Sequence, residues 1–493
     1  MNPAGSRNGQ SFIYPDSFSF LATGVETHSS NRMILATTSV AAFATPFLSS
    51  AIAFAVPRIG VAFQLDFIEA ALIPMVFLIP LASFMIFFGR VSDDVGRARI
   101  FKIGLALFGL ANLGAYLSPS YTFLIAMVFL AGLGSSILGT NATAIVSYAY
   151  SRGGRGYALG INAMSVYLGL TFAPFFGGFL IEFAGWRSIF LFSGPVALAD
   201  LVFAYVVLRG VDIQARGTRP SIAGALLIAA AILSLSVTVA VGDLLGLMKA
   251  LYLLPFPVVF FILFLYRDAH STNRVIPVGL LRGNRTFSAS SITALLNYLS
   301  TFSIVFIFSI YLQVILHVGP FMSGLLILPE PVFMVCLSPL AGKLSDRFGS
   351  RIIASLGMLV IGLSFLALYV INPLTRTEIL VLLGTIGIGF GLFSAPNTNS
   401  VMSSVQRENS GIASGFLGTM RFLGQLFSIV IATEIISSFI PRSLTVGMFS
   451  GNVVTITPEY FSSFTLGFRT VMLISAVLSL VGTVTSLVRN RGS

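Results

Sequence analysis

The sequence has little charge and very little cysteine, tryptophan or histidine. Its 493 residues include one cysteine and one tryptophan, and Asp, Glu, Lys and Arg together make up 9%. A soluble domain carries about 25% charged residues, so this chain cannot face water over its whole surface. The single Cys336 excludes an internal disulfide and a cysteine metal cluster. The three histidines, His28, His270 and His317, are too far apart in the sequence to predict a metal site.

Several chemical signatures are also missing. The chain has no Gly-x4-Gly-Lys-Ser/Thr phosphate loop, so ATP is not expected to drive it. It has no paired aspartates and no Ser/His combination at membrane depth, so an intramembrane enzyme is not expected. No cofactor is expected either. The first 32 residues are polar and the first apolar run is long enough to span, so no cleavable signal is expected.

Long apolar runs dominate what is present. Hydrophobic residues make up 56% of the chain, and after the polar start apolar runs recur about every 33 residues, each near the ~20 residues that a membrane helix needs. We expect about fourteen spans, the first at 34–57 and the last at 465–488. The sequence therefore predicts an all-α polytopic membrane protein without a separate soluble domain.

The basic residues indicate an orientation. With both termini on one side, 21 of the 28 Lys and Arg fall on that side and 6 on the other, while Arg421 lies inside a span. Basic loops stay in the cytoplasm, so we expect both termini to be cytoplasmic in a plasma-membrane protein surrounded by lipid. The net charge of +11 is thus an orientation signal and implies no nucleic-acid partner.

An internal repeat divides the chain. The segment GRVSDDVGRAR at 89–99 recurs as GKLSDRFGSR at 342–351, in each case between two apolar runs. The spacing fits two parallel six-helix bundles separated by an inserted helix pair near 221–266, with a substrate site between the halves. The predicted parts are a tail at 1–33, a bundle at 34–209, a linker with two spans at 210–285, a bundle at 286–488 and a tail at 489–493.

These motifs resemble the major facilitator superfamily, in its fourteen-helix drug:proton antiporter branch, over essentially everything after residue 33. The resemblance implies a cytoplasmic latch at the two repeated loops. Its residues are Gly89, Asp93, Gly96, Arg97, Gly342, Asp346, Arg347, Gly349 and Arg351. Glycine permits a tight turn, and we expect Asp93 and Asp346 to stand at the N-terminal ends of the helices that follow. The alternative is a basic turn that only obeys the orientation rule.

The span at 157–182 resembles the antiporter-motif helix of that branch. Its residues are Gly160, Gly169, Ala173, Pro174, Gly177 and Gly178, with alanine at 173 where the family has glycine. Small residues every four positions leave one helix face bare, and Pro174 removes a backbone hydrogen bond. We expect a hinge or a tight seam between the halves, with plain small-residue packing as the alternative.

Two proton-handling residues of the branch are absent. Leu48 stands where the first helix usually has an aspartate, Ala53 replaces a nearby asparagine, and Val128 stands where the fourth helix usually has an arginine. Neither Leu48 nor Val128 can carry or tune a proton, so proton coupling stays open at this stage.

Four polar residues inside other spans are candidates for the substrate or proton pathway. Glu330 lies about 18 Å and Arg421 about 15 Å along their helices, both near mid-bilayer, and an isolated charge at that depth is expensive. They either form a protonation or substrate site or neutralise each other as a structural ion pair. Asn297 is a further ligand contact or a helix-to-helix hydrogen bond, and Asp200 has a functional role or a local packing or lipid-interface role.

We therefore expect a monomeric secondary transporter of a small-molecule substrate, working by alternating access. The resemblance implies an exporter of small amphipathic or cationic compounds, but coupling to protons is not carried over with it, because Leu48 and Val128 replace the proton-handling residues. The alternatives are an uncoupled facilitator of a specific metabolite, which Leu48 and Val128 favour, and a membrane receptor or scaffold that kept the fold and lost transport.

Overall fold

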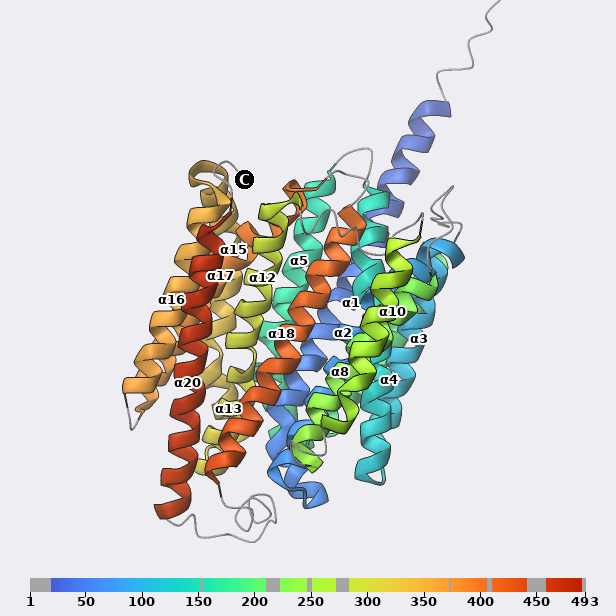
Figure 1. Ribbon diagram of the computed structural model, residues 1–493. Coiled ribbons are helices and arrows are strands. Elements are labelled where there is room, and N and C mark those ends of the chain that lie inside the picture. The colour runs from blue at the N-terminus through green and yellow to red at the C-terminus, as the bar shows by residue number, and fades with distance from the viewer. Residues whose placement is uncertain are drawn as a thin grey trace, which may run out of the picture.

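The computed structural model shows a bundle of long helices (Figure 1). It describes residues 19–150, 154–209, 222–245, 251–271, 283–371, 374–405, 410–440 and 458–489. Within these ranges there is no strand, and 13 helices are long and apolar enough to cross a membrane. This confirms the predicted all-α polytopic fold. Most of the two predicted tails and part of the predicted linker lie outside the described residues.

The N-terminal bundle contains six spans, and the fifth is built from three consecutive segments. They are α1 (Ser19–Phe63), α2 (Phe67–Val95), α3 (Arg97–Tyr116), α4 (Tyr121–Ala149), α5 (Arg155–Phe172) with the π-helix η1 (Ala173–Gly177) and α6 (Gly178–Ala184), and α7 (Ser188–Val207). The start of α2 is set locally by a capping box. The Glu69 N–H donates to the Asp66 carboxylate at 2.7 Å and the Asp66 N–H donates to the Glu69 carboxylate at 3.0 Å, which satisfies two N–H groups that no helical carbonyl can reach.

The inserted helices are α8 (Ile222–Leu245) and α10 (Pro255–Ala269), with the 3-10 turn η2 (Leu251–Leu253) before α10. The span expected at 249–266 corresponds to η2 and α10, and the 15 residues of α10 rise about 22 Å, short for a full crossing. α8 packs on α2 and on α10, and it also contacts α18 of the C-terminal bundle (Figure 1). Ala82, Ile228 and Leu423 share one apolar cluster there, so the inserted pair covers a seam between the two halves.

The C-terminal bundle also contains six spans, two of which are broken into segments. They are α12 (Arg285–Thr301) with α13 (Ser303–Ile310) and the π-helix η3 (Tyr311–Ile315), α14 (Pro320–Ile327) with α15 (Pro329–Phe348), α16 (Ser350–Val370), α17 (Arg376–Ser403), α18 (Ser410–Phe439) and α20 (Pro458–Leu487). The break between α14 and α15 falls at Leu328, immediately before Pro329, which has no N–H to donate.

The two repeated loops have the same local structure. Gly96 and Gly349 have φ angles of 112° and 87°, where a side chain would be strained. The Gly96 N–H donates to the Ser92 carbonyl at 3.0 Å, and the Gly349 N–H donates to the Ser345 carbonyl at 2.9 Å. Both loops lie at one end of the bundle, called here the motif end, and the far end is called the opposite end. The repeat is therefore structural as well as sequential.

The two halves meet most closely at the opposite end. There, α14 packs against η1 and α6, and α1 packs against α13. Along the bundle, α2 lies against α18 and α5 touches α15. These contacts form the surface along which the halves must move if the protein changes state.

Candidate functional site

Arg421 lies at the centre of a polar cluster within the C-terminal bundle. It projects from α18, eleven residues after that helix begins at Ser410, or about 16 Å along the helix. One guanidinium N–H donates to the Thr398 hydroxyl on α17 at 2.5 Å, and that hydroxyl donates to the Ser394 carbonyl at 2.8 Å. The guanidinium carbon lies 5.9 Å from the centre of the Tyr298 ring on α12. Arg421 is only half-buried, so a ligand entering between the helices can reach it.

The N-terminal half reaches the same cluster through Tyr167. The Tyr167 hydroxyl on α5 hydrogen-bonds to the hydroxyl of Ser394 on α17, across the seam between the halves. Thr171 lies four residues further along α5, and its hydroxyl donates to the Pro331 carbonyl on α15 at 3.2 Å, which is a second bond between the halves. The cluster therefore contains groups from both bundles. Sequence reasoning missed Tyr167 and Tyr298, because a tyrosine in an apolar run gives no sign of the neighbour it faces.

Glu330 does not pair with Arg421. Glu330 lies in the first turn of α15, where one carboxylate oxygen, Oε2, is buried without a hydrogen-bond partner. Its backbone packs directly on Gly387 of α17, where an added Cβ would overlap the Glu330 carbonyl. Among the described side chains no ion pair joins Glu330 to Arg421, which hydrogen-bonds to Thr398 instead. The structural ion pair is thus absent from this state.

The other two pathway candidates lie apart from the cluster. Asn297 is fully buried in the C-terminal bundle and its amide donates to the sulfur of Met358 on α16 at 3.3 Å, so it links two helices of one half. Asp200 is 5% exposed on α7, which packs against α3 and α1, and its Oδ2 has no hydrogen-bond partner. Asp200 is therefore inside the N-terminal bundle and away from the lipid interface.

The positions of the missing proton-handling residues are filled by hydrophobic packing. Leu48 and Val128 are both 0% exposed and belong to the main apolar core, as does Ala53. Among the described residues, no group of three or more His, Cys, Asp or Glu side chains could hold a metal ion.

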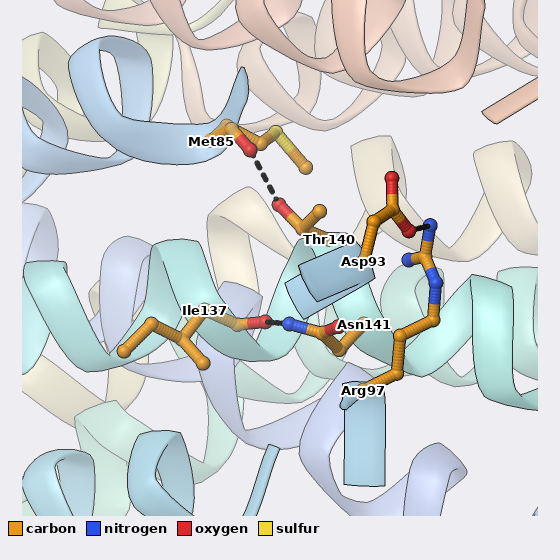
Figure 2. Close-up of polar contacts among 6 residues, drawn as sticks. All are labelled: Met85, Asp93, Arg97, Ile137, Thr140 and Asn141. Carbon is orange, nitrogen blue, oxygen red and sulfur yellow. Dashed lines mark hydrogen bonds and ion pairs between the residues drawn. The ribbon is translucent and has the colours of Figure 1, made fainter. Parts of the chain in front are cut away.

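The first copy of the repeated loop forms an ion pair at the motif end (Figure 2). Arg97 donates to the Asp93 carboxylate at 2.5 Å. Asp93 lies in the last turn of α2, which continues through Val95, and its partner is Arg97, the first residue of α3. Nearby, the Thr140 hydroxyl on α4 donates to the Met85 carbonyl on α2 at 3.0 Å. A Cβ on Gly89 would come within 3.1 Å of Thr140, so this glycine permits the close approach of α2 and α4.

The second copy is more open. Asp346 is likewise in the last turn of its preceding helix, α15, and not at the start of α16. Asp346 and Arg347 are exposed, Arg351 is half-buried, and a Cβ on Gly342 would meet nothing within 4 Å. The guanidinium of Arg347 lies 5.5 Å from the ring of Phe348. Only the first copy therefore forms a local ion pair among the described residues of the two loops.

The antiporter-motif helix contacts both halves. A Cβ on Gly169 would overlap the Phe43 carbonyl of α1 in the same half, and one on Gly178 would lie 2.7 Å from the Pro320 carbonyl of α14 in the other half. Ala173, Pro174 and Gly177 fall in η1, where the helix widens at the proline. On α14, Gly324 faces the Pro174 carbonyl so closely that a Cβ would overlap it. In contrast, a Cβ on Gly160 would meet nothing within 4 Å.

Polar bonds add to this glycine contact at the opposite end. The Phe321 N–H, at the start of α14, donates to the Glu182 carboxylate of α6 at 2.7 Å. The Gln313 amide donates to the Phe54 carbonyl at 3.2 Å, and the Ser309 hydroxyl donates to the Ala53 carbonyl at 3.3 Å. All three bonds cross between the halves. Together with the Gly178 and Gly324 contacts they form a contact between the halves, called here the seal, which sequence reasoning did not identify.

The model of the Major Facilitator Superfamily matches residues 38–429, which is most of the chain. This chain belongs to the major facilitator superfamily. The riboflavin transporter RibZ of Clostridioides difficile is 27% identical over 416 residues, covering 84% of this chain and 89% of that protein. The methylenomycin A resistance protein of Bacillus subtilis is 28% identical over 365 residues, covering 73% and 78%. The multidrug resistance protein Stp of Mycobacterium tuberculosis is 28% identical over 369 residues, covering 74% and 68%.

Solved structures agree with this membership at the level of the fold. A bacterial homologue of the human lysosomal transporter Spinster, solved in an inward-facing and unoccupied conformation, matches with a TM-score of 0.64 and 14% identity, covering 94% of this chain and 99% of that one. The peptide transporter PepTSo matches with a TM-score of 0.63 and 14% identity, covering 94% and 99%. This superfamily member is therefore a multi-pass membrane transporter and not an enzyme.

Proposed function

We propose that this superfamily member is an exporter of small amphipathic compounds, in the fourteen-helix drug:proton branch, and that it works by alternating access. The observation that carries the proposal is the position of the Arg421 cluster. It draws on both halves through the Tyr167–Ser394 bond, while a separate seal of Gly178, Gly324 and Glu182 closes the opposite end. A substrate site between two halves, closed on one side, is the arrangement that alternating access requires.

The named relatives support the exporting direction. Two of them are named as resistance proteins and one as a riboflavin transporter, and the chain covers two thirds or more of each. A resistance protein protects its cell when it moves a compound outward. We place this chain in the plasma membrane as a monomer, with the motif end in the cytoplasm, because the basic loops gather at that end.

Glu330 is our proposed proton carrier. The two positions that handle protons in the branch are apolar here, and Glu330 is a carboxylate inside a span with an oxygen that has no partner. Ionisable residues within membrane spans are costly and usually functional. Glu330 is also next to the seam, because the Thr171 hydroxyl of the N-terminal half bonds to the carbonyl of its neighbour Pro331.

Flux in proteoliposomes tests this function. Purified protein would be reconstituted with riboflavin or ethidium, one neutral and one cationic planar compound, and uptake would be followed with and without a pH gradient. We expect transport of at least one compound that the gradient accelerates, and Glu330→Gln should abolish the acceleration while equilibrium exchange continues, because exchange needs no net proton movement. Asn297→Ser is the control, since Asn297 is a buried polar residue of the same bundle that bonds only within that half.

The outcomes separate the alternatives. Flux that ignores the pH gradient in the unmodified protein would reject proton coupling and favour the uncoupled facilitator. If the pH gradient accelerates flux as much in Glu330→Gln as in the unmodified protein, Glu330 is rejected as the proton carrier. A correctly folded protein that transports neither compound, with or without a gradient, would count against the exporter.

A further inference from the structure

The charge at the centre of the cluster has no opposite charge beside it. Arg421 makes one hydrogen bond, to the neutral Thr398 hydroxyl, and its Nε is buried without a partner. Among the described side chains no carboxylate forms an ion pair with it. A cation held about 16 Å along a membrane helix without a counter-ion is unfavourable, because water and lipid screen it poorly there. The site therefore lacks one negative charge.

One aromatic ring lies beside the same guanidinium, and two more belong to the residues around it. The Tyr298 ring lies 5.9 Å from the Arg421 guanidinium carbon, and Phe390 packs on Tyr298 edge to face with ring centres 5.4 Å apart. Tyr167 closes the cluster from the other half through its bond to Ser394. Rings of this kind bind flat apolar surfaces, and a guanidinium can stack on a flat conjugated group while donating to an acid.

Among the described residues, no acid that would suit a cationic compound forms an ion pair within the Arg421 cluster. Leu48 and Val128 occupy buried positions in the core, and Asp200 lies within the N-terminal bundle on α7. Glu330 lies on α15 of the same bundle as Arg421, yet it forms no ion pair with Arg421. A cationic ligand at this cluster would face an unpaired positive charge, whereas an anionic ligand would supply the missing counter-ion.

A purely structural arginine is the competing explanation. Arg469, on α20, shows what that looks like in this chain, because its Nε donates to the Tyr369 carbonyl at 2.9 Å while its guanidinium lies 4.9 Å from the Tyr369 ring. Arg469 thus joins two helices of one half and has a partner for its Nε. The Nε of Arg421 has none, and its cluster includes a residue of the other half.

We propose that the Arg421 cluster is a binding site for planar aromatic compounds that carry a carboxylate or another acidic group, with Arg421 bound to the acid and Tyr298 and Tyr167 beside the ring. This inference rests on the proposed export function and narrows its substrate class from amphipathic compounds in general to aromatic anions.

Three probes of one shape and different charge test the inference. They are 2-naphthoate, 2-naphthamide and 2-naphthylmethylammonium, and their affinity for the purified full chain would be measured by calorimetry. A charge-assisted hydrogen bond predicts that naphthoate binds on the order of tenfold to a hundredfold more tightly than the ammonium compound. Arg421→Gln should remove this preference and leave naphthamide affinity within about twofold.

Matched variants show whether the effect is specific. Arg469→Gln removes another arginine of the same bundle that lies against a tyrosine ring, and it should leave the preference for naphthoate unchanged. Arg421→Lys keeps a cation and should keep naphthoate ahead of the ammonium compound, which identifies the charge as the cause even if Arg421→Gln fails to fold. Tyr298→Leu should weaken all three probes together.

The inference is overturned if the three probes bind equally, if the ammonium compound binds most tightly, if no probe binds, or if Arg421→Gln leaves naphthoate affinity unchanged. Its failure is distinct from failure of the export function. Arg421-dependent binding of naphthoate without flux in proteoliposomes would retain the site and reject transport, whereas flux of riboflavin or ethidium without a preference for naphthoate would do the reverse.

Discussion

Adding one methyl group at Gly178 should open the end of the bundle that the seal closes. In Gly178→Ala the new Cβ would lie 2.7 Å from the Pro320 carbonyl oxygen of the other half, whereas ordinary contact begins at 3.4 Å. The two backbones must therefore separate by several tenths of an ångström. Overpacking of this kind costs about 1–3 kcal/mol, and here the cost falls only on the sealed state. The ratio of sealed to open molecules should drop by about 5-fold to 150-fold.

The control for this change is Gly160→Ala in the same span. Alanine favours a helix over glycine by about 1 kcal/mol at both positions, so the two variants share any gain in helix stability. A Cβ on Gly160 meets nothing within 4 Å, so only Gly178→Ala disturbs the contact between halves. Any difference between the variants then reports the steric clash.

The distance between the halves is the direct measurement. Spin labels would be attached at Leu117 on the N-terminal half and Thr377 on the C-terminal half, two exposed positions at the opposite end, after Cys336 has been replaced by serine. Pulsed electron paramagnetic resonance should show a growing population of longer distances in Gly178→Ala and the distribution of the unmodified protein in Gly160→Ala. The reasoning is refuted if Gly178→Ala leaves the distances unchanged, or if both variants lengthen them equally.

Three further predictions concern the seal, the latch and the orientation. Glu182→Gln removes the charge that accepts the Phe321 N–H and should lengthen the same spin-label distances, though less than Gly178→Ala; an unchanged distribution would make this bond a bystander. Asp93→Asn breaks the ion pair to Arg97 and should lower the transport rate several-fold at unchanged abundance, since an i,i+4 ion pair adds only about 0.3–0.5 kcal/mol to stability; a loss of abundance alone would indicate a folding role. Cysteines at the exposed positions Asp94 and Lys343 should resist an impermeant thiol reagent in intact cells while one at Leu117 reacts, and the opposite result would invert the topology.

The structure also changes what is expected of Glu330 and Arg421. A permanent ion pair would predict that removing both charges restores what either single change loses. Since Arg421 bonds to Thr398 and Glu330 has an oxygen without a partner, the two changes should act independently, one on coupling and the other on binding. Transport measured in the double variant Glu330→Gln with Arg421→Gln would show any rescue.

Much of this protein was decided by the sequence alone. Apolar runs of about 20 residues can only be satisfied in lipid as helices, so the number and order of the spans follow from hydropathy. The repeated segments at 89–99 and 342–351 predict two parallel halves, and the positive φ angles of Gly96 and Gly349 explain why glycine recurs there. Leu48 and Val128 likewise show, from the sequence alone, that the two positions at which the antiporter branch carries an aspartate and an arginine are apolar here.

Partnership between distant residues was decided only by the tertiary structure. A glycine in a sequence indicates that a neighbour can approach closely, but it does not indicate which neighbour. The contact of Gly178 with the Pro320 carbonyl, and the lack of any atom within 4 Å of a Cβ on Gly160, could therefore not be predicted. Depth along a helix suggested that Glu330 and Arg421 would meet, yet depth does not give rotation about the helix axis, which turned Arg421 toward Thr398 and Tyr298. The same rotation placed Asn297 against Met358, within one half. Helix order follows from local hydropathy, whereas a site between helices depends on their mutual rotation, which packing sets across the whole bundle.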